Sequence, residues 1–101
     1  MYSVTIIYGK PTDPDAFDRY YRDVHIPIAK KMKGLSGWTL SWMDRSNPHA
    51  HLVVILSAPS KSVMDDIFAS DEGLATSKDL DNFVTGGVQF LFGETEMVTI
   101  S

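Results

Sequence analysis

The stretch PTDPDAFDRYYRDVHIPIAK, residues 11–30, predicts an amphipathic helix with a strong start signal. Asp13 is a favourable N-cap, and Pro14 suits the first helical position, where its missing N–H has no partner to lose. Apolar and aromatic side chains then recur at helical spacing, at Phe17, Tyr20, Tyr21, Val24 and Ile28. Such a stripe is typical of a helix that packs one face on the rest of a domain.

A second proline decides where this helix is disturbed. Pro27 has no N–H to donate to the carbonyl of Asp23, so we expect the helix to kink or end near His25–Ile26. Gly34 is a plausible C-cap a few residues later. The disturbance therefore falls beside a histidine.

Period-two alternation predicts strands on both sides of this helix. A short turn-forming loop joins two of them as an antiparallel hairpin. The four predicted strands are residues Tyr2–Tyr8, Leu35–Met43, His51–Ser57 and Val88–Ile100. A second helix is expected to begin at the N-cap Ser60, to restart at Ser70 and to end before Gly86–Gly87.

The resulting order, β-α-β-β-α-β, predicts an α+β, ferredoxin-like domain with a four-stranded antiparallel sheet. We expect one domain over residues 1–101. Its helices can cover only one face of the sheet, and the other face still carries large apolar side chains. A patch of that kind favours a homodimer in which the two sheets pack together and enclose a cavity.

Composition excludes several classes of protein. The chain has 101 residues, 44% of them hydrophobic, which suits a soluble globular domain. Its net charge of −4 disfavours nucleic-acid binding, and the absence of cysteine excludes disulfides and thiolate nucleophiles. The first residues do not resemble a signal peptide, and the longest aliphatic run, Leu52–Leu56, is far shorter than the roughly 20 residues of a membrane span. We therefore expect a cytoplasmic protein that binds no membrane.

Several functional signatures are missing. The chain has no GxGxxG fingerprint for a dinucleotide, no phosphate-binding loop and no GxSxG nucleophile elbow, and we predict no cofactor. His49 and His51 are spaced i, i+2 and could ligate a metal. A solvated hairpin loop after Pro48 explains them better, and we predict no metal site.

The segment FDRYYRDVHIPI, residues 17–28, resembles the signature of the EthD family, in which an aromatic residue and a Tyr/Trp pair precede His, one residue, Pro and an aliphatic. Gly34–Leu35 before an aromatic strand, and Asn82–Phe83 before Gly86–Gly87, are also similar to that family. The resemblance implies a dimeric α/β barrel with a ligand cavity between the sheet and the first helix, and with His25 beside that cavity. It does not fix a reaction, because related barrels carry out several.

His25 is the predicted catalytic residue. It lies at the border of the apolar stripe, next to the expected helix distortion, where a carbonyl lacks its usual donor. An imidazole titrates near neutrality, so it can act as a general acid/base or anchor a ligand oxygen by a hydrogen bond. We expect burial to lower its pKa. The sequence assigns no acidic partner to its other ring nitrogen.

Aromatic side chains predict the wall of the pocket. Trp38, Leu40 and Trp42 share one face of the second strand, and apolar aromatic walls are typical of small-molecule sites. Trp38 is the preferred wall residue, because it resembles a pocket aromatic of a related lactone isomerase. The full set of predicted ligand-pocket residues is Tyr8, Tyr21, Trp38, Trp42 and Phe90. We expect this pocket between the open face of the sheet and the first helix.

Two functional classes remain open at this point. The first is a cofactor-independent enzyme that acts on a small oxygenated apolar or aromatic molecule by proton transfer at His25. The second is a non-catalytic accessory protein of a catabolic pathway that binds such a molecule in the same cavity. An enzyme needs a second polar group that converges on the cavity, whereas a binding protein needs only the right shape.

Overall fold

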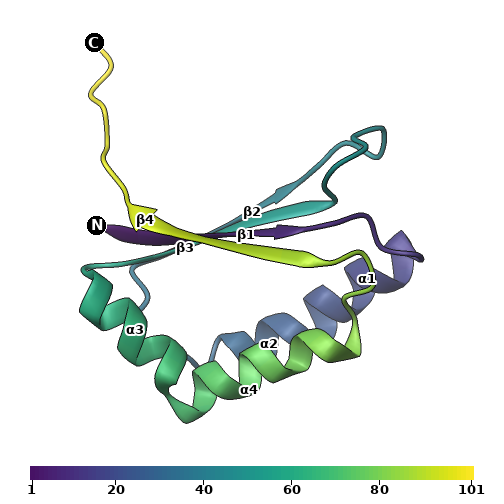
Figure 1. Ribbon diagram of the computed structural model, residues 1–101, viewed down its shortest axis with the longest axis horizontal. Coiled ribbons are helices and arrows are strands. Elements are labelled where there is room, and N and C mark those ends of the chain that lie inside the picture. Colours follow the sequence, from purple (N-terminus) through teal and green to yellow (C-terminus); the bar gives the residue numbers. More distant parts are fainter.

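The computed structural model, which describes residues 1–101, places the sheet in one layer and all helices in a second layer on one of its faces (Figure 1). The strands are β1 (Tyr2–Tyr8), β2 (Gly37–Trp42), β3 (Leu52–Ala58) and β4 (Val88–Glu94). The helical segments are α1 (Pro14–Tyr20), a π-helix (Tyr21–His25), α2 (Ile26–Ala29), α3 (Lys61–Ala69), α4 (Asp71–Asp79) and a 3₁₀ turn (Leu80–Asn82).

The four strands form one antiparallel sheet in the order β2-β3-β1-β4. β2 and β3 pair as the expected hairpin, with Trp42 opposite Leu52. Each helical connection returns the chain to the same sheet, which is the split βαβ arrangement of ferredoxin-like domains. The predicted α+β class is confirmed.

The core lies between one face of the sheet and the inner sides of the helices. Alternate side chains of β1 and β3 are buried there, as the period-two pattern predicts. The buried strand residues that share this face are Tyr2, Val4, Ile6, Tyr8, Leu52, Val54, Leu56 and Ala58. Phe17 and Tyr21 of the first helical segment and Met64 and Ile67 of α3 pack against them.

Side-chain caps set the starts of three helices. Asp13, Ser60 and Ser70 each accept a backbone N–H in the first turn of the helix that follows, which is α1, α3 and α4 respectively. A cap of this kind stabilises a helix by about 1 kcal/mol. The three predicted starts are therefore confirmed.

The first helix continues past Pro27 instead of ending there. The chain widens into a π-helix over Tyr21–His25, in which Ile26 donates to the carbonyl of Tyr21, and α2 then adds one more turn. Because a new α-helical turn starts at Ile26, Pro27 occupies a first-turn position where no N–H is needed. The predicted distortion is present as a π-turn.

Gly34 is not the C-cap of this helix, because α2 ends at Ala29 with Lys30 as its C-cap. Gly34 instead lies in the loop to β2 with a φ of 108°. A Cβ there would also approach the side chain of Ile67 to 3.2 Å. Positive φ and close approach to α3 both favour glycine at this position.

β4 ends at Glu94, whereas the alternation predicted a strand to Ile100. Glu94 pairs with Tyr2, the first residue of β1. One more backbone hydrogen bond follows, from Thr95 to the carbonyl of Met1, and the rest of the tail then projects away from the sheet (Figure 1). The predicted strands over Leu35–Met43 and His51–Ser57 shift by one or two residues at their ends.

The face of the sheet opposite the helices is uncovered in the single chain. Ile55 and Leu91 on this face are 38% and 55% exposed, and the tail adds the exposed side chains Met97, Val98 and Ile100. This face therefore exposes apolar side chains, but Thr5 and Thr39 lie on either side of Ile55, so they do not form the continuous patch that was expected. None of the helices has the length and apolarity that crossing a membrane requires.

Candidate functional site

A small cavity lies between the helix-covered face of the sheet and the helices. The volume that the centre of a water molecule can reach is about 30 Å³, which is enough for about two waters. Eleven of its fourteen lining residues are hydrophobic, and the other three are His25, Thr76 and Ser77. No lysine, arginine, aspartate or glutamate lines the cavity.

The π-turn brings His25 to this cavity. A π-helix rotates the residues after it relative to a regular α-helix, and such turns are frequent at functional sites. His25 is the last residue of the turn, it is only 4% exposed, and its ring packs against Tyr21 and Phe83. The proline at position 27 therefore places the histidine inward indirectly, through the widened turn that precedes it.

His25 forms a buried pair with a carboxylate from another part of the chain. Its Nδ1 lies 2.9 Å from Oδ2 of Asp79, the last residue of α4, and both side chains are at most 6% exposed. The other carboxylate oxygen, Oδ1, accepts hydrogen bonds from the Tyr20 hydroxyl at 2.7 Å and from the Asn82 amide at 2.9 Å. Three donors thus compensate the carboxylate for its loss of water.

The pKa shifts of the pair define its protonation state. Burial lowers the pKa of His25 below its ordinary value, and the neighbouring Asp79 carboxylate opposes this shift only in part. Burial tends to raise the pKa of Asp79, but hydrogen bonds from Asn82, Tyr20 and His25 outweigh it and hold this pKa low. At neutral pH the imidazole is therefore neutral and the carboxylate is charged.

The carboxylate fixes the tautomer of His25. Because an ionised carboxylate can only accept, the hydrogen of the neutral ring lies on Nδ1 and is donated to Asp79. Nε2 then carries a lone pair, and it makes no hydrogen bond within the protein. A neutral imidazole with a free Nε2 beside an apolar cavity can accept a proton or a hydrogen bond.

Most of the residues predicted for the pocket line this cavity. Tyr8, Tyr21, Trp38 and Phe90 line it together with His25. Burial raises the pKa of Tyr8, and it raises the pKa of Tyr21 to about 12, so both phenols stay protonated at neutral pH.

Trp42 lies outside this cavity. Its ring contacts Tyr21 and His51, and the guanidinium of Arg22 lies 4.7 Å from its ring centre. Trp42 shares a sheet face with Trp38 but is four residues further along β2, near the edge of the core. A shared face was thus not enough to place both rings at one site.

The cavity is on the opposite side of the sheet from the one expected. The sequence favoured a pocket between the open face and the first helix, but the lining residues from β1, β2 and β3 all belong to the helix-covered face. The alternation in each strand separates two faces without saying which one the helices cover. The packing of α1 and α3 makes that choice.

Sequence reasoning missed the partners of His25. Asp79 follows Lys78 in a polar helix and lies two residues before another aspartate, Asp81, so neither hydrophobicity nor spacing distinguishes it from its neighbours. Asn82 was noted only as part of the pattern before Gly86–Gly87. Tyr20 was assigned to the apolar stripe, although its hydroxyl donates to Asp79. Only the packing of α4 beside α2 brings these groups together.

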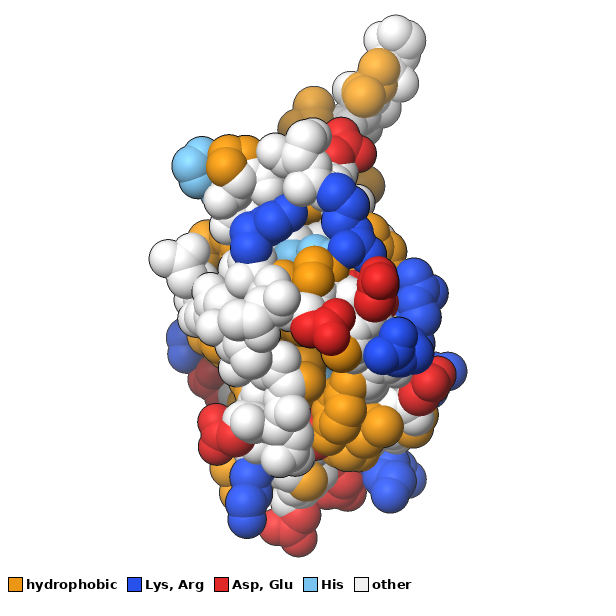
Figure 2. Space-filling model, turned by 90° about the vertical axis from the view of Figure 1, so that its right-hand side faces the viewer, with side chains coloured by type: hydrophobic (Ala, Val, Ile, Leu, Met, Phe, Trp, Pro, Cys, Tyr) orange, Lys and Arg blue, Asp and Glu red, His pale blue; other side chains and the backbone are white.

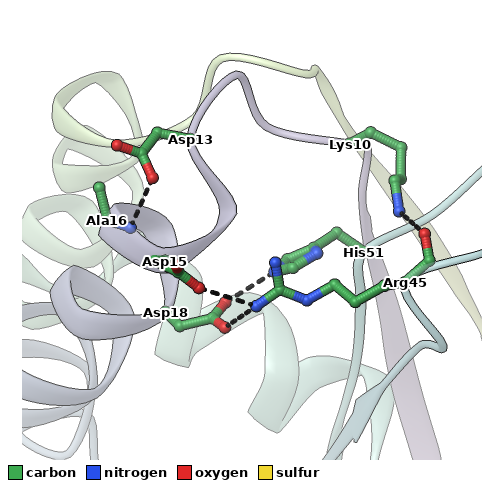
Figure 3. Close-up of polar contacts among 7 residues, drawn as sticks. All are labelled: Lys10, Asp13, Asp15, Ala16, Asp18, Arg45 and His51. Atoms are coloured by element: carbon green, nitrogen blue, oxygen red, sulfur yellow. Dashed lines mark hydrogen bonds and ion pairs between the residues drawn. The ribbon is translucent and has the colours of Figure 1, made fainter.

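His51 forms a second pair with a carboxylate, at the end of the molecule that carries the loop between β2 and β3. Its Nε2 lies 2.7 Å from Oδ1 of Asp18, and Arg45 binds the other oxygen of Asp18 at 3.0 Å and Asp15 at 3.2 Å (Figure 3). Lys10 donates to the Arg45 carbonyl. These contacts fasten the loop to α1.

The two loop histidines have different surroundings. His51 is 2% exposed, whereas His49 is exposed in the loop, so the solvated loop proposed for both describes only His49. Figure 2 shows this end of the molecule, where acidic and basic side chains are intermingled. No group of three His, Cys, Asp or Glu side chains lies close enough together to hold a metal ion.

Comparison with known proteins gives one relative and several similar folds. No family model matches the chain. An uncharacterized 11.0 kDa protein in the thcB–thcC intergenic region of Rhodococcus erythropolis is 37% identical over 101 residues, which cover 97% of this chain and 98% of that protein.

Solved structures agree on the fold. An ethyl tert-butyl ether (EthD) family protein from Bacillus halodurans superposes with a TM-score of 0.86 at 23% identity, over 95% of this chain and 99% of that one. SnoaB, a cofactor-independent oxygenase from Streptomyces nogalater, superposes with a TM-score of 0.67 at 13% identity, over 96% and 93%. The predicted resemblance to the EthD family is confirmed at the level of the fold.

Proposed function

Because the chain belongs to the same family as the 11.0 kDa Rhodococcus erythropolis protein and has the fold of an EthD family protein, we propose that it binds a small oxygenated apolar or aromatic molecule beneath its helices. We further propose that His25 acts on this molecule as a general base and acid. The step uses His25 in the cavity together with the Asp79 carboxylate that holds its ring.

The observation that carries this proposal is the His25–Asp79 pair. A buried carboxylate holds Nδ1–H, leaves Nε2 free, and stabilises the imidazolium that forms when Nε2 takes a proton. The Tyr20 and Asn82 donors fix the carboxylate in turn. A protein that only binds an apolar molecule would need no such chain of oriented groups, and for this reason we favour proton transfer over simple binding.

The cavity must widen to hold a ligand, because small-molecule sites usually enclose about 300 Å³ or more. Of the helices around it, α4 has a largely exposed outer side: it buries only Gly73 and Asp79, and Leu74 is 58% exposed. Asp79 also borders an open groove of about 450 Å³ between α2 and α4. His25 lines the cavity and Asp79 borders the groove, so their hydrogen bond lies between the two, and we propose that the ligand enters here by displacement of α4.

Hydrogen–deuterium exchange on a ketone tests the proposal directly. 2-Tetralone is an uncharged aromatic ketone with an acidic C–H next to its carbonyl, and its exchange in D₂O can be followed by NMR. We expect the protein to accelerate this exchange above the buffer rate. His25→Gln should lower the accelerated rate by about 10²-fold or more, since glutamine cannot shuttle a proton.

His51→Gln is the matched control, because it makes the same change in the other histidine–carboxylate pair. We expect it to leave the exchange rate within about twofold of the unmodified protein. If 2-tetralone binds but does not exchange faster than in buffer, the non-catalytic binding function is correct and the proton-transfer function is wrong. If His25→Gln leaves both binding and exchange unchanged, His25 is not part of the site.

We also propose that the chain forms a homodimer through its open sheet face. Ile55, Leu91 and the tail residue Ile100 expose apolar surface that a second copy would cover. A stable interface of this kind buries about 2,000 Å² or more in total. Light scattering at micromolar concentration should give twice the mass of one chain, and a single-chain mass would contradict the proposal.

A further inference from the structure

Two enclosed side-chain atoms, Nε1 of Trp38 and Nδ1 of His51, make no hydrogen bond, and of these two residues only Trp38 lines the cavity. A tryptophan N–H normally finds an acceptor when it is buried, and an unpaired buried donor destabilises the folded protein. Trp38 lines the cavity, so an acceptor that occupies the cavity would remove this cost.

The unpaired donor lies beside the candidate site. The Trp38 N–H is near enough to the Tyr21 oxygen to hold back the rise in the pKa of that phenol, although it makes no hydrogen bond to it. The Tyr21 ring in turn lies 5.2 Å, between ring centres, from the imidazole of His25. Strand β2 and the π-turn thus place three residues in the lining of the cavity: one with an indole donor, one with a phenol donor and one with a free imidazole nitrogen.

The surroundings restrict what can accept these hydrogen bonds. No lysine, arginine, aspartate or glutamate lines the cavity, and Phe68, Leu80 and Phe90 form part of its apolar wall. A carboxylate or phosphate would enter without a cation to pair with it, at a large desolvation cost. A carbonyl oxygen is uncharged and accepts two hydrogen bonds, which matches two neighbouring donors.

We propose that the Trp38 N–H and the Tyr21 hydroxyl form a donor pair for the carbonyl oxygen of an uncharged, enolisable ketone whose acidic carbon faces His25. This inference rests on the proposed function and names its substrate class. The C–H bond next to the carbonyl breaks, and its proton goes to Nε2 of His25. The electron pair of that bond forms a carbon–carbon double bond, and the carbonyl electrons move to the oxygen.

The donor pair serves the state in which charge develops on oxygen. Two donors that are already in place stabilise an enolate more than the ketone from which it forms, which is the requirement for acceleration. The proton then returns from His25 to carbon or oxygen, so the step balances without an oxidant or reductant. Asp79 stabilises the intervening imidazolium.

Trp42, the only other tryptophan, serves as a reference for Trp38. The Trp42 Nε1 is not among the enclosed unpaired atoms, and Trp42 does not line the cavity. The two indole N–H signals in a nitrogen–proton NMR spectrum therefore report on a site atom and a reference atom, and Trp42→Phe assigns them.

The first experiment adds 2-tetralone, or its deoxygenated analogue tetralin, to the unmodified protein. We expect 2-tetralone to move the Trp38 indole signal downfield by about 0.5 ppm or more, as a new hydrogen bond does, and to leave the Trp42 signal in place. Tetralin has the same ring skeleton without the oxygen, and it should not produce the downfield shift. Equal responses to both molecules would overturn the donor pair.

The second experiment measures affinity and exchange in Trp38→Phe. We expect binding of 2-tetralone to weaken by about tenfold, the effect of one lost hydrogen bond, and binding of tetralin to weaken clearly less. Trp42→Phe, which changes a ring outside the cavity, should leave both affinities nearly unchanged. An equal loss for both ligands in Trp38→Phe would show that the ring acts only by packing. If exchange and ketone preference persist in Trp38→Phe, this inference fails and the role of His25 stands. If the unmodified protein binds neither molecule, both fail.

Discussion

The two histidine–carboxylate pairs use the same chemical groups in different surroundings. In the His25–Asp79 pair both side chains are almost fully buried, and the free nitrogen belongs to a residue that lines the cavity. In the His51–Asp18 pair the carboxylate is 27% exposed and is shared with Arg45. The second nitrogen of His51 is enclosed without a partner, next to the rings of Phe17 and Trp42.

The difference shows that pairing alone does not make a histidine functional. His51 can exchange no proton with a ligand, because its Nδ1 is buried away from any cavity or solvent and its Nε2 is hydrogen-bonded to Asp18. His25 has one nitrogen held and one free, which is the arrangement a general base needs. The second pair therefore fastens a loop, whereas the first is suited to chemistry.

The largest effect is expected when the two carboxylates are neutralised one at a time. Asp79→Asn keeps the shape of the side chain but can donate to Nδ1, so it allows the wrong tautomer and no longer stabilises the imidazolium. We expect the 2-tetralone exchange rate to fall by at least about tenfold. Asp18→Asn should leave it within about twofold. Equal effects of the two variants would remove the distinction between the pairs.

A pH profile tests whether Asp79 acts as a positioning residue. In the unmodified protein the exchange rate should fall as pH drops and His25 becomes protonated, and the midpoint should lie below the ordinary histidine pKa of about 6.5. Without the Asp79 carboxylate, nothing opposes the effect of burial, so the midpoint should move to still lower pH. An unchanged midpoint in Asp79→Asn would mean that the carboxylate has only a structural role.

An effect of intermediate size is expected in the pH dependence of stability, which should depend on the protonation of His25. The folded-state pKa of His25 is lowered, so between this pKa and about 6.5 the unfolded chain binds a proton that the folded chain does not. Stability is then greatest above about 6.5 and falls as pH decreases. The urea midpoint should drop between pH 7 and pH 5.5 by more in the unmodified protein than in His25→Gln; an equal drop would contradict this origin.

The smallest effect is expected from the exposed ion pair that Arg45 forms with Asp15, beside the His51–Asp18 pair. Arg45 and Asp15 are 56% and 78% exposed, so water screens their ion pair. Arg45→Ala should change the free energy of unfolding by about 0.5 kcal/mol or less, as measured by urea titration, and should not affect 2-tetralone exchange. A loss above about 1 kcal/mol would show that the loop is fastened through Arg45 and not chiefly through His51.

The local sequence determined the elements and their starts. The caps at Asp13, Ser60 and Ser70 act within one helical turn, and alternation in β1 acts between adjacent residues, so both can be identified without knowledge of the rest of the chain. The Pro27 distortion beside His25 was predicted for the same reason. Its form was not, because a π-turn, a kink and a helix end all accommodate a missing N–H.

Tertiary structure alone decided which groups meet. Asp79 is 54 residues from His25, and nothing in its neighbourhood in the chain marks it as the partner. The face of the sheet that forms the cavity was likewise set by the packing of the helices, since alternation defines two faces and is symmetric between them. The same holds for β4, which ends at Glu94 because β1 begins at Tyr2. Pairing between distant segments depends on geometry that no local pattern encodes, and the candidate site consists of such pairings.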